Sequence, residues 1–253
     1  MGRLVKAEFL KLSKSLGFKI LILCGIAVGL LIGVIFAFMP MPTDIPEELV
    51  AATAAITQLT GIDAFLMEIA SVGNVGIFAG VFVALFIGSE FSHRTFGLSI
   101  MAGCSRISLF LAKFIVFFVG LLVVMLVYPI ALAIFMGIVN GFGEFNAEVW
   151  THLARTMGLL LLGYTALAGF CAMIATLIKN VGGTIGASLG ILVILGSIVA
   201  IPNLSSVMRF TFVYQIAQVA QPSSMLMYIA VCAGTFLITM AVSVLTFKKT
   251  ELK

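Results

Sequence analysis

Five charged or titratable side chains lie close together between two long apolar stretches of this 253-residue chain. They are Glu90, His93, Arg94, Arg106 and Lys113, in the segment LFIGSEFSHRTFGLSIMAGCSRISLFLAKF. A carboxylate among basic groups can form ion pairs and charge-assisted hydrogen bonds with a partner. Because only 9% of all residues are charged, so dense a group indicates a purpose other than packing in lipid.

The sequence contains none of the common motifs for binding nucleotide or hydrolysing a substrate. It has no GxxxxGK[ST] phosphate loop, no HExxH zinc motif and no GxSxG nucleophile motif. The four cysteines show no CxxC spacing, which favours small apolar residues over metal ligands. We therefore expect no catalytic residue, no metal and no cofactor in this chain.

Membrane-spanning helices must position the charged segment. Hydrophobic residues make up 62% of the chain, which excludes an ordinary soluble domain. A helix needs about 20 apolar residues to cross a bilayer core, and backbone groups in lipid must be bonded within their own segment. Six runs qualify: 20–39, 69–89, 114–140, 157–178, 182–201 and 224–247. The predicted fold is all-α, a single transmembrane domain over residues 1–253 with a six-helix bundle at 20–247.

The basic residues predict the orientation of these spans. With six spans, twelve of the fourteen Lys and Arg residues fall on the side that holds both chain ends. Cytoplasmic loops retain Lys and Arg, so both termini, including the tail 248–253, are predicted to be cytoplasmic. Topology thus accounts for the basic balance of the chain, and no nucleic-acid partner is expected.

Residues 1–19 are predicted to form an amphipathic helix in the membrane interface. An apolar stripe with spacings of four, three and four runs through Val5, Phe9, Leu12 and Leu16. Lysines occupy the other faces, as in helices that lie on an anionic lipid surface. A solvated basic leader is the alternative.

Two predicted spans carry glycine at every fourth position. The first has Gly25, Gly29 and Gly33, and the fifth has Gly182, Gly186 and Gly190. Such ridges let helix backbones approach closely in lipid. We expect at least one ridge to be a helix contact, within a subunit or across a dimer.

Three features together resemble the permease subunits of ABC-2 type transporters. The first is the N-terminal AEFLKL, and the second is six spans with both ends inside. The third is the exit of the second span, where Glu90, Phe91, Arg94 and Thr95 precede Ser105, Arg106 and Lys113. Arg94 stands where the family usually has Gly, and Cys104 replaces a frequent proline.

The resemblance implies a permease that dimerises with a second copy or a related permease. Two copies of a separate cytoplasmic ATPase would drive it and would hold the ATP and Mg. The segment after the second span would be a coupling helix on the ATPase, with these contact residues: Glu90, Phe91, Arg94, Thr95, Phe96, Leu98, Ser105 and Arg106. Small members with this kind of N-terminus look like subunits of peptide, bacteriocin or lantibiotic export and immunity systems of the bacterial cytoplasmic membrane. Their cargo would be amphipathic, such as an antimicrobial peptide, a toxin or a drug.

Three other interpretations stay open. A membrane-embedded substrate-binding subunit of an ATPase-driven importer is also six-spanning. An intramembrane enzyme would need paired acids, or a serine with a base, at membrane depth. The charges after the second span would also be explained if they only set the topology.

Overall fold

The computed structural model describes residues 2–38, 56–93, 95–101, 103–199, 205–220, 222 and 224–249. Within these ranges the regular secondary structure is helical, without a strand, so the predicted all-α fold is confirmed. Asp44, Pro46 and Glu47 predict a further helix start, which lies outside the described residues.

Within the described residues, five helices are long and apolar enough to cross a membrane. They are α2 (Leu16–Phe38), α8 (Arg106–Asn140), α9 (Ala147–Ile178), α10 (Val181–Val199) and α13 (Met225–Lys249). A sixth crossing is made if a bent pair of helices counts as one span. This pair consists of Gly76–Ser92 and Thr95–Met101, which meet at 67°. The chain is therefore a polytopic membrane protein, as its apolar runs predict.

The bent span is built from several consecutive elements. Helix α5 (Val72–Val83) continues into a π-helical turn, η1 (Ala84–Gly88), and then into α6 (Ser89–Ser92). Helix α7 (Thr95–Met101) follows the bend. The run predicted to begin at Ile69 starts instead at Val72, because Ile69 ends the preceding helix α4 (Gly61–Ile69).

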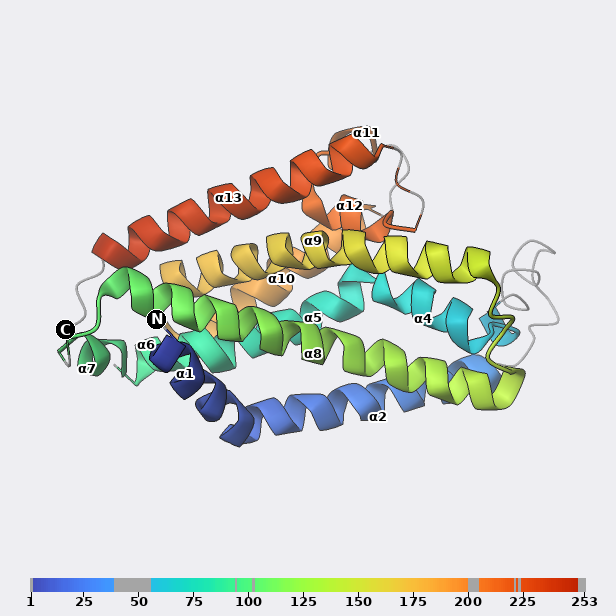
Figure 1. Ribbon diagram of the computed structural model, residues 1–253, viewed down its shortest axis with the longest axis horizontal. Helices are drawn as coiled ribbons and strands as arrows, with labels where there is room; N and C mark the ends of the chain where they lie inside the picture. The colour runs from blue at the N-terminus through green and yellow to red at the C-terminus, as the bar shows by residue number, and fades with distance from the viewer. Residues whose placement is uncertain are drawn as a thin grey trace.

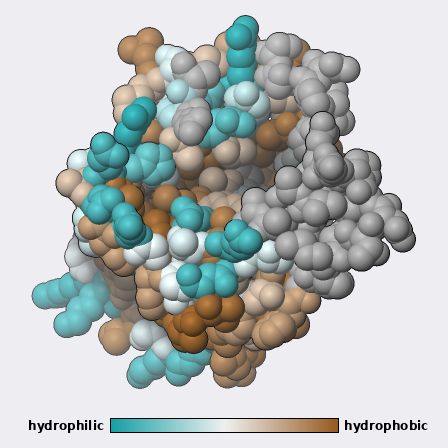
Figure 2. Space-filling model, turned by 90° about the vertical axis from the view of Figure 1, so that its right-hand side faces the viewer, coloured by the Kyte–Doolittle hydropathy of each residue, from teal (hydrophilic) through white to brown (hydrophobic). Residues whose placement is uncertain are grey.

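The long helices run side by side along the molecule (Figure 1). Helix α1 (Gly2–Lys14), α7 and the last turn of α13 lie towards one end of the bundle, and α8 and α9 are joined at the other. Figure 2 looks onto that second end, where hydrophilic residues gather beside hydrophobic ones. The common end for α1 and α13 fits an even number of crossings, and its cytoplasmic location stays a prediction.

Helices α8 and α9 form the centre of the bundle. In the most apolar 18-residue stretch of each helix, 56% of the residues are buried in α8 and 61% in α9. The corresponding share is 22% in α2 and 17% in both α10 and α13. Two tyrosine hydroxyls bond backbone carbonyls in this core: Tyr164 donates to Ile69 and Tyr228 to Leu159, each at 2.8 Å. Helices α2, α10 and α13 thus present faces to the surroundings, as expected of helices in contact with lipid.

The N-terminal segment is divided differently from the prediction. Helix α1 ends at Lys14 and α2 begins at Leu16, so the first span starts before the predicted Ile20.

Two short helices, α11 (Ser205–Met208) and α12 (Phe212–Ala217), follow α10 and precede α13 along the chain.

Candidate functional site

Four charged side chains from three helices form a cluster beside α1. The Lys113 Nζ atom of α8 lies 2.6 Å from Glu8 Oε2 of α1 and 2.7 Å from Glu90 Oε1 of α6. Lys11 Nζ of α1 lies 2.8 Å from Glu90 Oε1 and 3.5 Å from Glu8 Oε1. We call Glu8, Lys11, Glu90 and Lys113 the ion cluster. It ties the N-terminal helix to the end of the bent span and to the central helix α8.

The ion cluster is largely shielded from solvent. Lys113 is 1% exposed, and the side chains of Glu8 and Glu90 are 9% and 12% exposed, whereas that of Lys11 is 55% exposed. The two carboxylates pair with the two ammonium groups, so their formal charges sum to zero. A buried charge is tolerated only when it is paired and hydrogen-bonded. Each buried member of the ion cluster therefore depends on the others.

Aromatic rings surround the buried ammonium group. Lys113 Nζ lies 4.5 Å from the centre of the Phe86 ring and 5.7 Å from that of Phe96. A cation over an aromatic face is stabilised by the ring quadrupole, and more so where water is excluded. Phe86 belongs to η1 and Phe96 to α7, so the rings link Lys113 to both sides of the bend.

Glu8 faces the bundle because of its position on α1. It shares one helical face with Val5 and Leu12, at spacings of three and four residues. Leu12 is buried against α8, where Gly120 leaves room for it: a Cβ atom at Gly120 would lie 2.9 Å from Leu12 Cδ2. The packing of Leu12 thus turns the Glu8 carboxylate towards Lys113.

Glu90 is presented by an irregular stretch of helix. In η1 the Ser89 N–H donates to the carbonyl of Ala84, five residues earlier, and such π-helical turns are frequent at functional sites. The Ser89 hydroxyl donates to the Leu85 carbonyl at 2.5 Å, and the Thr95 hydroxyl to the Glu90 carbonyl at 3.4 Å. These bonds satisfy carbonyl groups where the regular helix is interrupted.

The surroundings of Lys11 change the pKa of its ammonium group. Burial by itself lowers the pKa of Lys11. The hydrogen bond to Glu90 and the negative charges of Glu90 and Glu8 outweigh burial, so the pKa is raised above 10.5. Lys11 therefore keeps its charge at any physiological pH.

A second aromatic cluster holds the segment after the bend against the end of α13. The Phe96 ring lies 4.7 Å from Phe91 and 5.0 Å from Phe247, and Phe110 lies 5.5 Å from Phe247. Arg106 Nη1 donates to the carbonyl of Lys248 at 2.9 Å. Ser105 caps α8 by accepting a hydrogen bond from the Ser108 N–H. Helix α7 is therefore packed on the bundle.

Of the eight predicted coupling residues, six make contacts within the chain, among them Thr95, Ser105 and Arg106 through the hydrogen bonds given above, and two have side chains that are not described. Glu90, Phe91 and Phe96 are occupied within the chain, because Glu90 belongs to the ion cluster and the two rings pack on the bundle. Arg94 and the side chain of Leu98 lie outside the described residues. Among the described side chains of this segment, Met101 is a large apolar one that is mostly exposed, at 78%. The role of these residues in contact with an ATPase stays a prediction.

The predicted interfacial stripe is not buried as a unit. Leu12 is buried and Val5 is half-buried against the core, whereas Phe9 and Leu16 are exposed. Glu8 was missed by sequence reasoning as a site residue. Its spacing from Val5 and Leu12 was a usable signal, because a carboxylate on the apolar face of a helix needs a partner.

The two glycine ridges differ in their surroundings, since the ridge of α2 is packed against another helix and the ridge of α10 is not. A Cβ at Gly29 would lie 2.6 Å from the Tyr128 carbonyl oxygen, and one at Gly33 would lie 2.6 Å from the Phe135 ring. The ridge of α2 is therefore a contact with α8 inside the subunit. In α10, a Cβ at Gly182, Gly186 or Gly190 would meet no atom within 4 Å, so this ridge lies open.

Within the described part of the chain, no three His, Cys, Asp or Glu residues lie close enough together to hold a metal ion. No protein-family model matches the sequence. No curated protein matches it either.

Proposed function

We propose that this protein is the transmembrane permease subunit of an ABC transporter, dimeric and driven by separate cytoplasmic ATPase subunits. Its cargo would be an amphipathic substrate such as an antimicrobial peptide, toxin or drug, exported across the bacterial cytoplasmic membrane. The observation that carries the proposal is the ion cluster, which joins α1, the bent span and α8 at one end of the bundle.

The ion cluster is suited to transmit a displacement from a partner into the bundle. If an ATPase pushes on α7, the aromatic contact between Phe91 and Phe96 passes the movement to α6 and Glu90. Separating Glu90 from Lys113 would leave a buried lysine with one carboxylate fewer, which is costly. The cheaper response is for α1 and α8 to move together with α6.

The same segment carries exposed side chains that suit contact with a partner. Met101 is exposed at the end of α7, and His93 and Ile107 are exposed on either side of it. Flexible apolar side chains such as methionine are common where one protein surface receives another. An ATPase groove that encloses Met101 would bind α7 without disturbing the ion cluster.

The decisive experiment expresses the full-length chain together with the ATPase subunits encoded beside its gene. We expect co-purification of the two chains and ATP hydrolysis that requires both. Met101→Glu should abolish co-purification, because a carboxylate in an apolar groove is left unpaired. Phe145→Glu, which also places a carboxylate at an exposed apolar position but in the α8–α9 connection at the other end of the bundle, is the matched control for the interface. Co-purification that survives Met101→Glu, or no ATPase partner at all, would exclude this assignment.

A further inference from the structure

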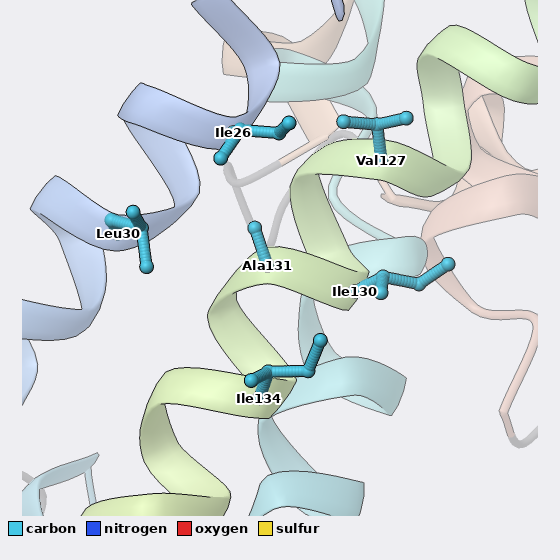
Figure 3. Close-up of a pocket in the computed structure, with 6 residues that line it drawn as sticks. All are labelled: Ile26, Leu30, Val127, Ile130, Ala131 and Ile134. Carbon is cyan, nitrogen blue, oxygen red and sulfur yellow. The ribbon is translucent and has the colours of Figure 1, made fainter. Parts of the chain in front are cut away.

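A groove lies on the outside of the bundle between the middle of α2 and the middle of α8 (Figure 3). Its volume is about 400 Å³, within the range of roughly 300–1,000 Å³ that is typical of small-molecule sites. Six aliphatic side chains line it: Ile26, Leu30, Val127, Ile130, Ala131 and Ile134. Such a lining suits a hydrocarbon chain and offers no hydrogen bond to a polar ligand.

The close contact of α2 with α8 creates the floor of this groove. Gly29 lets α2 approach until a Cβ atom there would lie 2.9 Å from Ala131 Cβ. Ala131 lies between the longer side chains of the two helices in Figure 3. One wall is Ile26 and Leu30, and the opposite wall is Ile130 and Ile134. Two small residues flanked by large ones thus leave a channel open to the lipid.

A lysine stands in line with the groove at the start of α2. Lys19, Ile26 and Leu30 are seven and four residues apart, so they share one face of the helix. At about 1.5 Å per residue, the step from Lys19 to Leu30 covers about 16 Å. One leaflet of a hydrocarbon core about 30 Å thick has nearly the same depth, about 15 Å. A lipid with its headgroup at Lys19 would therefore end its acyl chain in the groove.

The charge of Lys19 is available to such a headgroup. Lys19 is exposed, and it takes no part in the ion cluster. A cationic side chain at the membrane surface attracts anionic lipid. Lys14, also exposed, ends α1 and does not share the face of α2 that leads to the groove.

We propose that Lys19 and the α2–α8 groove form a binding site for one anionic phospholipid. The phosphate pairs with the Lys19 ammonium group. One acyl chain follows α2 past Leu23 and lies between Ile26 and Ile130. The site selects its lipid by headgroup charge and holds it by the buried chain.

Native mass spectrometry of the full-length protein tests this, with phosphatidylglycerol or phosphatidylcholine of identical acyl chains added to the detergent solution. The wild type should retain one phosphatidylglycerol per chain in preference to phosphatidylcholine. Lys19→Gln should weaken retention of phosphatidylglycerol about fivefold, and the matched control Lys14→Gln should not. Ile26→Trp, which fills the groove, should remove the bound lipid whatever its headgroup.

Several results would overturn the proposal. They are equal retention of both lipids by the wild type, equal losses for Lys19→Gln and Lys14→Gln, or undiminished retention by Ile26→Trp. Conversion of a dimer to monomers by Ile26→Trp, with lipid still bound, would assign the groove to a second copy instead. If Ile26→Trp does not accumulate, Ile134→Trp fills the groove from the opposite wall, and the Lys19→Gln comparison stands without either.

Discussion

Helix α8 is held along its length by two contacts of opposite kinds. Near its start, Lys113 is bound to α1 and α6 by charge, and near its middle, Tyr128 and Ala131 receive the glycine ridge of α2 by shape alone. A packing contact that depends on shape loses little of its stabilisation when one atom moves slightly. A buried charge loses most of its stabilisation when its partner is removed. The end of α8 beside α1 is therefore the part where a small change has the largest effect.

The largest effect is expected from removal of the central charge. Lys113→Met leaves Glu8 and Glu90 facing each other in a buried site, so stability should fall by about 3–5 kcal/mol. Thermal unfolding of the purified protein in detergent measures this. The triple variant Glu8→Gln, Glu90→Gln, Lys113→Met is the control, because it removes every buried charge at once and should recover most of the loss. A triple variant as unstable as Lys113→Met would show that the ion cluster is not a mutually dependent unit.

The contact by shape should respond less strongly. Gly29→Leu forces a side chain against the Tyr128 carbonyl and Ala131, and overpacking of this kind costs about 1–3 kcal/mol. The same thermal unfolding assay gives the value. Gly29→Ala should lie between the wild type and Gly29→Leu, since one methyl group already meets these atoms. If Gly29→Leu unfolds like the wild type, α2 does not pack on α8 through this ridge.

The exposed member of the ion cluster should contribute least. Lys11→Gln should cost less than about 1 kcal/mol, because solvent screens a half-exposed pair. Since the pKa of Lys11 is raised in the folded state, its contribution is complete below pH 10.5 and is lost as the pH rises through the folded value. The difference in unfolding temperature between wild type and Lys11→Gln should therefore be equal at pH 7 and pH 9 and shrink above pH 10.5. A difference that vanishes between pH 7 and pH 9 contradicts this.

The open glycine ridge of α10 should have no effect on the folding of a single chain. A Cβ atom at Gly186 would meet no atom within 4 Å, so Gly186→Leu has open space around it and the unfolding temperature of the monomer should match that of the wild type within the error. If α10 is the dimer contact, the variant should instead lower the dimeric fraction in mass photometry, as overpacking at an interface does. A dimer that persists in Gly186→Leu would assign the dimer contact to another surface.

Much of the architecture follows directly from the sequence. The six apolar runs predict the spans, because bilayer thickness sets the length of each and backbone polarity requires a helix. Glu90 and Lys113 stood out by their charge beside these runs, and both belong to the ion cluster. Local composition is enough for these features, since lipid constrains each segment separately.

The partners of each residue were decided by tertiary structure alone. Two glycine ridges with the same spacing look alike in the sequence. In the structure Gly29 packs against α8, whereas a Cβ atom at Gly186 would meet no atom within 4 Å. Phe9 and Glu8 are neighbours, and the charged residue, not the ring, turned inward because Lys113 lay within reach. Spacing along a helix specifies which residues share a face. Only packing between helices far apart in the chain specifies what that face meets, because the attraction of a charge or a ridge depends on a partner that local sequence does not contain.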